Sequence, residues 1–172
     1  LGGNFMTGYQ DGSLYLDGQK YSIPSLLAKQ FEFVGGGNFN QPLMPDNSGL
    51  GLNSKLWESD YVTASKLRYK TDCKGVSALK PVKDLFSIAT AGTYLQHISG
   101  SFQNISVPYA KISDYVNPSF GNFGNKNPYY ARFASKQGIS TMLIDAVAQQ
   151  PSFFSLWVGM EDIYDYARNG GF

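Results

Sequence analysis

The run 152–158, SFFSLWV, constrains the fold more than any other stretch because almost every residue in it is apolar or aromatic. A short run of this kind without alternation is typical of a strand buried on both faces of a parallel sheet. A helix is predicted before it over 140–150, with Ser140 as the N-cap and Pro151 beyond its end. A second helix is predicted after it, ending near Arg168 before Asn-Gly-Gly. This order predicts an α/β fold with three layers.

Other segments predict further elements around this one. Ser22 is placed to cap a helix, and residues 35–54, rich in Gly, Asn, Pro and Ser, predict a long loop. Segments 67–70 and 76–80 predict a half-exposed pair of strands, and a short helix is expected over 109–116. The predicted helix after Ser22 has an apolar face formed by Ile23, Leu26, Leu27 and Phe31. Two aromatic clusters are expected in the core. The first is Phe153, Phe154 and Trp157, and the second is Tyr129, Tyr130 and Phe133.

Composition narrows the function classes. The chain of 172 residues carries a net charge of +1 from 14 basic and 13 acidic residues, without a run of like charges. Charge therefore gives no indication of a nucleic-acid partner or an anionic membrane. No apolar run reaches the roughly 20 residues of a membrane-spanning helix. Cys73 is the single cysteine and has no ligand neighbours at zinc spacing, so we predict no metal finger and no bound cofactor. His97 is the single histidine and is expected to be an ordinary surface or half-buried residue.

Four stretches, in order along the chain, carry a resemblance. They are LGGNFMTGY at 1–9, NISVPYAK at 104–111, NPYYARF at 127–133 and PSFFSLWVGMED at 151–162. The first resembles a nucleophile turn of the form LGNSLTAGY, and the second resembles a block of the form NLGVPGA followed by Arg or Lys. Together they resemble the SGNH (GDSL-like) hydrolase superfamily, in its bacterial-envelope lipase or acylhydrolase-like branch.

This resemblance implies a fold and a location. The expected fold is a flavodoxin-like three-layer α/β/α sandwich over a single domain, 1–172, incomplete at both ends. A loop-rich insertion with a short β pair is expected at about 35–100. The family resemblance also implies an extracytoplasmic protein, either periplasmic or a lipoprotein of the outer membrane or cell surface. Because the chain opens inside a motif, we expect it to be a piece of a longer product.

The catalytic positions depart from the family pattern. The family's reaction needs a serine activated by a histidine, together with an oxyanion hole that stabilises the developing charge. By the resemblance, Asn4 stands in place of the serine, Tyr109 in place of the glycine of the second block, and Glu161 in place of the oxyanion-hole asparagine. The family's later Asp-x-x-His block does not occur before residue 172. Gly3, Gly159 and Asp162 are the remaining family-site positions, and Asp162 can equally be an acidic residue at a helix start.

Three functions follow as hypotheses. The leading one is a catalytically degenerate domain that serves as a binding or scaffolding module. Tyr109, Tyr164 and Tyr166 are its possible contacts for a glycan or an acylated small molecule, because tyrosine joins a flat apolar face to a polar tip. The alternative is an ester hydrolase whose missing residues lie outside this chain, with Thr7 or Ser106 as a replacement nucleophile. The third is a structural subunit whose open sheet edge is completed by another segment or chain.

Overall fold

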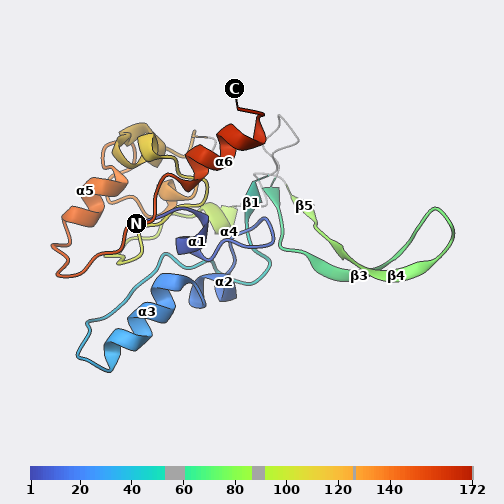
Figure 1. The fold of residues 1–172 in the computed structure, drawn as a ribbon, viewed down its shortest axis with the longest axis horizontal. Helices are drawn as coiled ribbons and strands as arrows, with labels where there is room; N and C mark the ends of the chain where they lie inside the picture. The colour runs from blue at the N-terminus through green and yellow to red at the C-terminus, as the bar shows by residue number, and fades with distance from the viewer. Residues whose placement is uncertain (53–60, 87–91, 126, 172) are drawn as a thin grey trace.

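The fold is a mixed α+β arrangement with two small antiparallel sheets. The computed structural model describes residues 1–52, 61–86, 92–125 and 127–171 (Figure 1). One sheet has the order β1–β2–β5, and the other pairs β3 with β4. The strand bounds are β1 Gly51–Leu52, β2 Tyr61–Val62, β3 Lys66–Thr71, β4 Ser77–Val82 and β5 Leu85–Phe86. No parallel sheet is present in the described part, so the prediction of a three-layer α/β/α sandwich is wrong.

Short helices make up the rest of the regular structure. The α-helices are α1 Asn4–Thr7, α2 Leu16–Lys20, α3 Ile23–Glu32, α4 Gly92–Leu95, α5 Met142–Val147 and α6 Met160–Arg168; the 3₁₀ turns are η1 Ile112–Val116, η2 Pro118–Gly121 and η3 Tyr130–Arg132. The helices predicted after Ser22 and before Asn169 are confirmed as α3 and α6. The helix predicted from Ser140 is shorter and is capped by Thr141, whose side chain accepts from the N–H of Ile144. The helix predicted over 109–116 is reduced to the turn η1.

The segment 152–158 is the main error of the sequence reading. It is extended, but it touches the rest of the backbone through one parallel bridge, between Gly2 and Trp157, and through the bonds of Leu1 with Ser155 and Trp157. The side chains of Phe153 and Phe154 are 62% and 74% exposed, so they and Trp157 are not core residues. The ring of Phe153 meets Phe31 of α3, and the ring of Trp157 meets Phe5 of α1, so the segment is only partly covered by the described residues.

The core instead forms around the second aromatic cluster, which the sequence placed correctly. Tyr129 and Tyr130 are fully buried, and Phe133 meets the ring of Tyr130 edge-on at 5.5 Å. The hydroxyl of Tyr129 donates to the carbonyl of Leu50 over 2.6 Å, which joins the cluster to the start of the β1 region. The aliphatic partners in this core are Leu14, Met44, Leu50, Ile105, Val107 and Met142.

The long loop predicted over 35–54 contains no helix or strand from 36 to 49, and residues 53 and 54 lie outside the described residues. Its inner part is held by a buried guanidinium. Arg132 is 3% exposed and donates to the carbonyls of Pro42 and Leu43. Burial lowers the pKa of Arg132 to about 10. The side chain of Gln19 also binds this loop: it donates to the carbonyl of Pro42 and accepts from the N–H of Met44.

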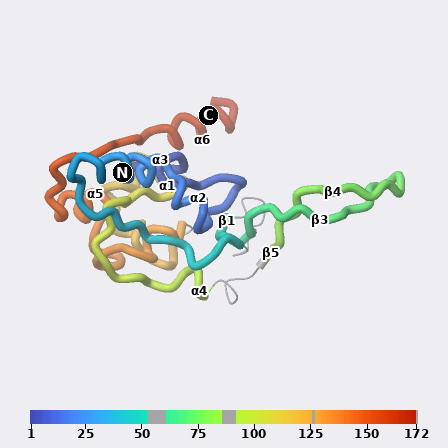
Figure 2. The backbone as a smooth tube through the Cα atoms, turned by 90° about the horizontal axis from the view of Figure 1, so that it is seen from below, coloured from blue at the N-terminus to red at the C-terminus, as the bar shows by residue number. Residues whose placement is uncertain are grey.

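The molecule exposes more surface than its mass requires. Its accessible area is 10494 Å², whereas a compact monomer of 18.9 kDa exposes about 8,300 Å². One source is the β3–β4 hairpin, which projects from the body (Figures 1 and 2). Another is the apolar face of α3, where Leu26 and Phe31 remain 47% and 38% exposed. The pattern thus predicted the helix correctly, although its apolar face is only partly covered.

Candidate functional site

The first motif folds into one tight helical turn, α1, between two glycines. Asn4 begins the turn, and Gly8 ends it in the left-handed conformation with φ +76°. Thr7 closes it internally: its hydroxyl donates to the carbonyl of Asn4 and accepts from the N–H of Tyr9. A β-carbon at Gly8 would lie 2.1 Å from the carbonyl oxygen of Gly18, so only glycine fits this approach.

The second motif lies directly against this turn. Val107 donates its N–H to the carbonyl of Gly2, and the side-chain amide of Asn104 donates to the carbonyl of Met6 over 3.0 Å. The N–H of Tyr109 donates to Oδ1 of Asn4 over 3.0 Å. Tyr109 has φ +61°, a conformation that non-glycine residues adopt at a cost. The side-chain amide of Asn4, which the resemblance aligns with a nucleophile, is therefore bound by the backbone of the second motif.

The third motif reaches the same turn from the other side. Glu161 is 7% exposed, and a β-carbon at Gly3 would lie 3.4 Å from its Cγ. Burial raises the pKa of Glu161, and the nearby backbone N–H of Asn4 opposes the shift by favouring the charged carboxylate. Asp162 is placed apart from Asn4, where its carboxylate accepts from the N–H of Ile112.

The cleft between these motifs is nearly filled. Its volume is about 10 Å³, which matches a single water molecule. The lining residues are Gly3, Asn4, Phe5, Ala110, Trp157, Val158, Gly159, Met160 and Glu161. Five of the six positions named by the resemblance thus come together in space, around a volume that fits one water molecule.

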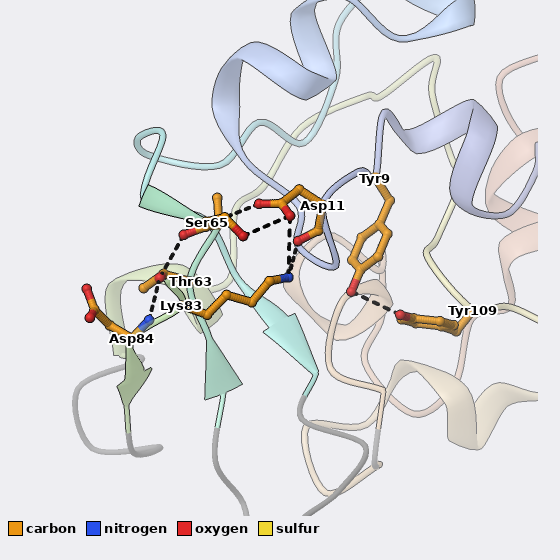
Figure 3. A network of polar contacts seen from close by, with 8 residues as sticks. Tyr9, Asp11, Thr63, Ser65, Lys83, Asp84 and Tyr109 are labelled. Atoms are coloured by element: carbon orange, nitrogen blue, oxygen red, sulfur yellow. Dashed lines mark hydrogen bonds and ion pairs between the residues drawn. The ribbon is translucent and has the colours of Figure 1, made fainter. Parts of the chain in front are cut away.

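Tyr109 also shapes the rim of this region together with Tyr9, which the sequence reading did not single out. The two hydroxyls are 3.1 Å apart and the rings meet edge-on at 5.1 Å (Figure 3). Burial raises the pKa of Tyr9 well above its usual range. Tyr164 and Tyr166, predicted as ligand contacts, lie on α6 with side chains 56% and 60% exposed and do not line the cleft.

The replacement nucleophiles have no base beside them. The hydroxyl of Thr7 is buried and bound within α1. The hydroxyl of Ser106 is buried and has no hydrogen-bond partner among the described residues. Nε2 of His97 lies 3.1 Å from the carbonyl oxygen of Ala134 instead. Neither Thr7 nor Ser106 therefore forms the nucleophile–base pair that acyl transfer needs.

A larger hollow lies elsewhere, between the long loop and the segment before the second motif. Its volume is about 370 Å³, within the range of small-ligand sites. Its walls combine two aromatic rings with amides and hydroxyls, supplied by Phe39, Asn40, Gln41, Leu43, Ser99, Gly100, Ser101 and Phe102. The sequence reading missed this groove because its two walls are about sixty residues apart; a loop rich in amides was the only available signal.

Two further searches concern the described residues alone. Within them no group of three or more His, Cys, Asp or Glu side chains is arranged to hold a metal ion. No helix described here has the length and apolar character needed to cross a membrane. Comparison with protein families, curated proteins and solved structures finds no match. The family resemblance therefore rests on the residues of the motifs.

Proposed function

We propose that this chain is a catalytically degenerate, SGNH-like binding or scaffolding protein of the bacterial envelope. One observation carries the proposal: two polar groups of Asn4 face the other two motifs. Its side-chain oxygen accepts from the N–H of Tyr109, and its backbone N–H interacts with the carboxylate of Glu161. The contact between motifs distant in sequence supports the family resemblance, and the nature of these contacts argues against the family's chemistry.

The chemical reason is the charge that acyl transfer develops. A tetrahedral intermediate carries an oxyanion, which must be met by hydrogen-bond donors and not by an anion. Here the donor at residue 4 already serves a carboxylate, which lies where the family holds an asparagine. The amide nitrogen of Asn4 is not a nucleophile, because its lone pair is delocalised into the carbonyl. Each of these changes opposes ester hydrolysis independently.

The catalytic half of the proposal is tested with p-nitrophenyl acetate, p-nitrophenyl butyrate and a fluorophosphonate probe. We expect no turnover above buffer and no labelled serine by mass spectrometry. The same holds for Asn4→Ser, because Glu161 still occupies the backbone donor of residue 4. Stoichiometric labelling of any serine in the unmodified protein would overturn the proposal. It would support the alternative, an ester hydrolase whose remaining residues lie outside this chain or are replaced.

The binding half is supported by the groove beside the long loop. Aromatic rings next to amides and hydroxyls suit a glycan, because a sugar offers both apolar C–H faces and hydroxyl groups. We test an acylated glycan, tri-N-acetylchitotriose, by calorimetric titration against the wild type and Phe39→Ala. We expect the variant to lose binding, while Phe123→Ala, outside the groove lining, keeps it. Absence of heat with the wild type would leave the scaffolding role as the function.

A scaffolding role is supported by the segment 153–158. Leu1 pairs with Ser155 and Trp157, so the polar backbone groups of Leu156 point to the opposite side. An extended segment with one unpaired side is a site at which another strand can add. Sedimentation of the purified chain tests this reading. A complex with another chain or segment supports it, and a stable monomer of this polypeptide alone contradicts it.

A further inference from the structure

The β3–β4 hairpin has two chemically different faces. In its register Arg68 lies opposite Lys80, and Tyr69 lies opposite Leu79. Residues directly opposite each other share a face, and alternate residues along a strand lie on the same face. One face therefore carries four cations and the other carries four apolar side chains; the cations are Lys66, Arg68, Lys70 and Lys80, and the apolar residues are Leu67, Tyr69, Leu79 and Pro81.

Charge is concentrated in this hairpin. Residues 66–82 contain five basic residues and one acidic residue, a net of +4 in a chain whose total is +1, which leaves −3 for the remainder. Arg68 is neutralised at the base by a two-bond pair with Asp84. Lys66, Lys70 and Lys80 form no ion pair with another described residue. Three cations on this face are thus free to meet an anionic partner.

Both faces are open to solvent. The exposed fractions are 70% for Leu67, 76% for Tyr69 and 53% for Leu79, and the hairpin extends away from the body in both views (Figures 1 and 2). A two-stranded hairpin has no hydrophobic core of its own. The apolar side chains on it therefore contribute no burial energy to the fold. Apolar groups held in water are stabilised when a partner covers them.

The hairpin is nevertheless fixed in direction at its base. Asp11 accepts from the backbone N–H and the hydroxyl of Ser65 and pairs with Lys83, as Figure 3 shows. Between β4 and β5, the N–H of Asp84 donates to the hydroxyl of Thr63, which follows β2. Because Asp11 follows the α1 turn closely, the hairpin is anchored beside Tyr9 and Tyr109 and is presented as a projecting arm.

We propose that this arm docks on an anionic lipid surface. Amphipathic elements bind such surfaces by burying an apolar face at the interface while cations meet the headgroups. Tyrosine suits the boundary, and lysine side chains extend from it toward the phosphates. A nucleic-acid partner would use the cations but leave Leu67 and Leu79 in water. The linear sequence conceals this pattern because the charges alternate with apolar residues.

The expected affinity follows from the number of free lysines. A lysine near an anionic leaflet strengthens binding by about fivefold, so three lysines contribute on the order of a hundredfold. This contribution is screened by salt, because the Debye length shrinks from about 30 Å at 0.01 M to about 3 Å at 1 M. Binding should therefore be strong at low ionic strength and weak at high ionic strength.

The test is co-sedimentation with vesicles of phosphatidylcholine alone and of phosphatidylcholine with one-third phosphatidylglycerol. We expect binding to the anionic vesicles and little to the neutral ones. Reversing the charge of the three free lysines of the arm should weaken binding to anionic vesicles by on the order of a hundredfold or more. The double variant Leu67→Ser with Leu79→Ser should weaken this binding by a smaller factor, and that loss should persist in high salt. The lysine variant is Lys66→Glu, Lys70→Glu and Lys80→Glu.

A matched control separates the arm from net charge. It reverses three lysines on the body, Lys20→Glu, Lys29→Glu and Lys136→Glu, and should keep vesicle binding within a small factor of the wild type. Circular dichroism establishes that each variant is folded. Equal binding to neutral and anionic vesicles overturns the proposal, as does equal loss in the arm and body variants. Binding to duplex DNA but not to vesicles in the same buffer also overturns it, in favour of a nucleic-acid partner.

Discussion

Replacing Gly8 by alanine should destabilise the fold much more than the same change at Gly35. Both glycines are left-handed, with φ +76° and +82°, so both variants incur the steric cost of that conformation, about 1–2 kcal/mol. They also share the gain from restricting the unfolded chain, about 0.4–1 kcal/mol. At Gly35 the new β-carbon meets nothing within 4 Å. At Gly8 it would lie 2.1 Å from the backbone oxygen of Gly18, which cannot rotate away.

The difference in unfolding free energy between the two variants therefore measures the steric overlap of the new β-carbon at position 8 with the carbonyl oxygen of Gly18. Forcing a carbon into a packed site costs about 1–3 kcal/mol, so we expect about 1 kcal/mol for Gly35→Ala and about 3 kcal/mol for Gly8→Ala. For a chain of this length one kcal/mol lowers the melting temperature by about 2–4 °C, which gives decreases of about 2–4 °C and 6–12 °C. Calorimetry and urea unfolding measure both. Equal decreases would refute the close approach of the two backbone turns.

Three further outcomes test the core and the site. Tyr129→Phe should cost about 1–3 kcal/mol in urea unfolding, because the buried carbonyl of Leu50 loses its donor. Asn104→Ala should cost a similar amount, about 1–3 kcal/mol, because the carbonyl of Met6 loses its donor and one of the hydrogen bonds between the first two motifs is lost. Because burial raises the pKa of Glu161 above 4.5, its contribution to stability is full below that pH and is lost as pH rises through the native pKa. Glu161→Gln should therefore gain stability relative to the wild type as pH rises above 4.5 and through the native pKa of Glu161, and a difference that stays constant as pH rises would contradict the assignment.

Elements governed by local chemistry were predictable from the sequence. The helix after Ser22 has Pro24 in its first turn, where the missing N–H has no cost, and α6 ends at Asn169 before two glycines. The hairpin followed from two alternating segments, but β3 is exposed along its whole length and not half-exposed as expected. In each case the deciding interactions lie within a few residues, so they are visible in a linear pattern.

Burial of apolar residues was less predictable, because it depends on what the rest of the chain supplies. Tyr130 and Phe154 belong to runs of similar composition, yet one is fully buried and the other is 74% exposed. Tyr130 is covered because segments around Phe120 and Met142 pack over it. Over 153–158 the described residues supply no such layer. A run of apolar residues therefore indicates a need for burial, and the partner that meets this need cannot be inferred from the run itself.

The candidate site shows the same division between backbone and chemistry. By the resemblance, Gly3, Asn4, Tyr109 and Glu161 belong to one site, and these four residues do lie together. The resemblance could not show how the substitutions depend on one another. Glu161 uses the backbone N–H of Asn4, while Tyr109 uses the side chain of the same residue. Restoring a serine at position 4 would remove the acceptor of Tyr109 and leave the carboxylate in place, so a single reversion cannot recover the family's oxyanion site.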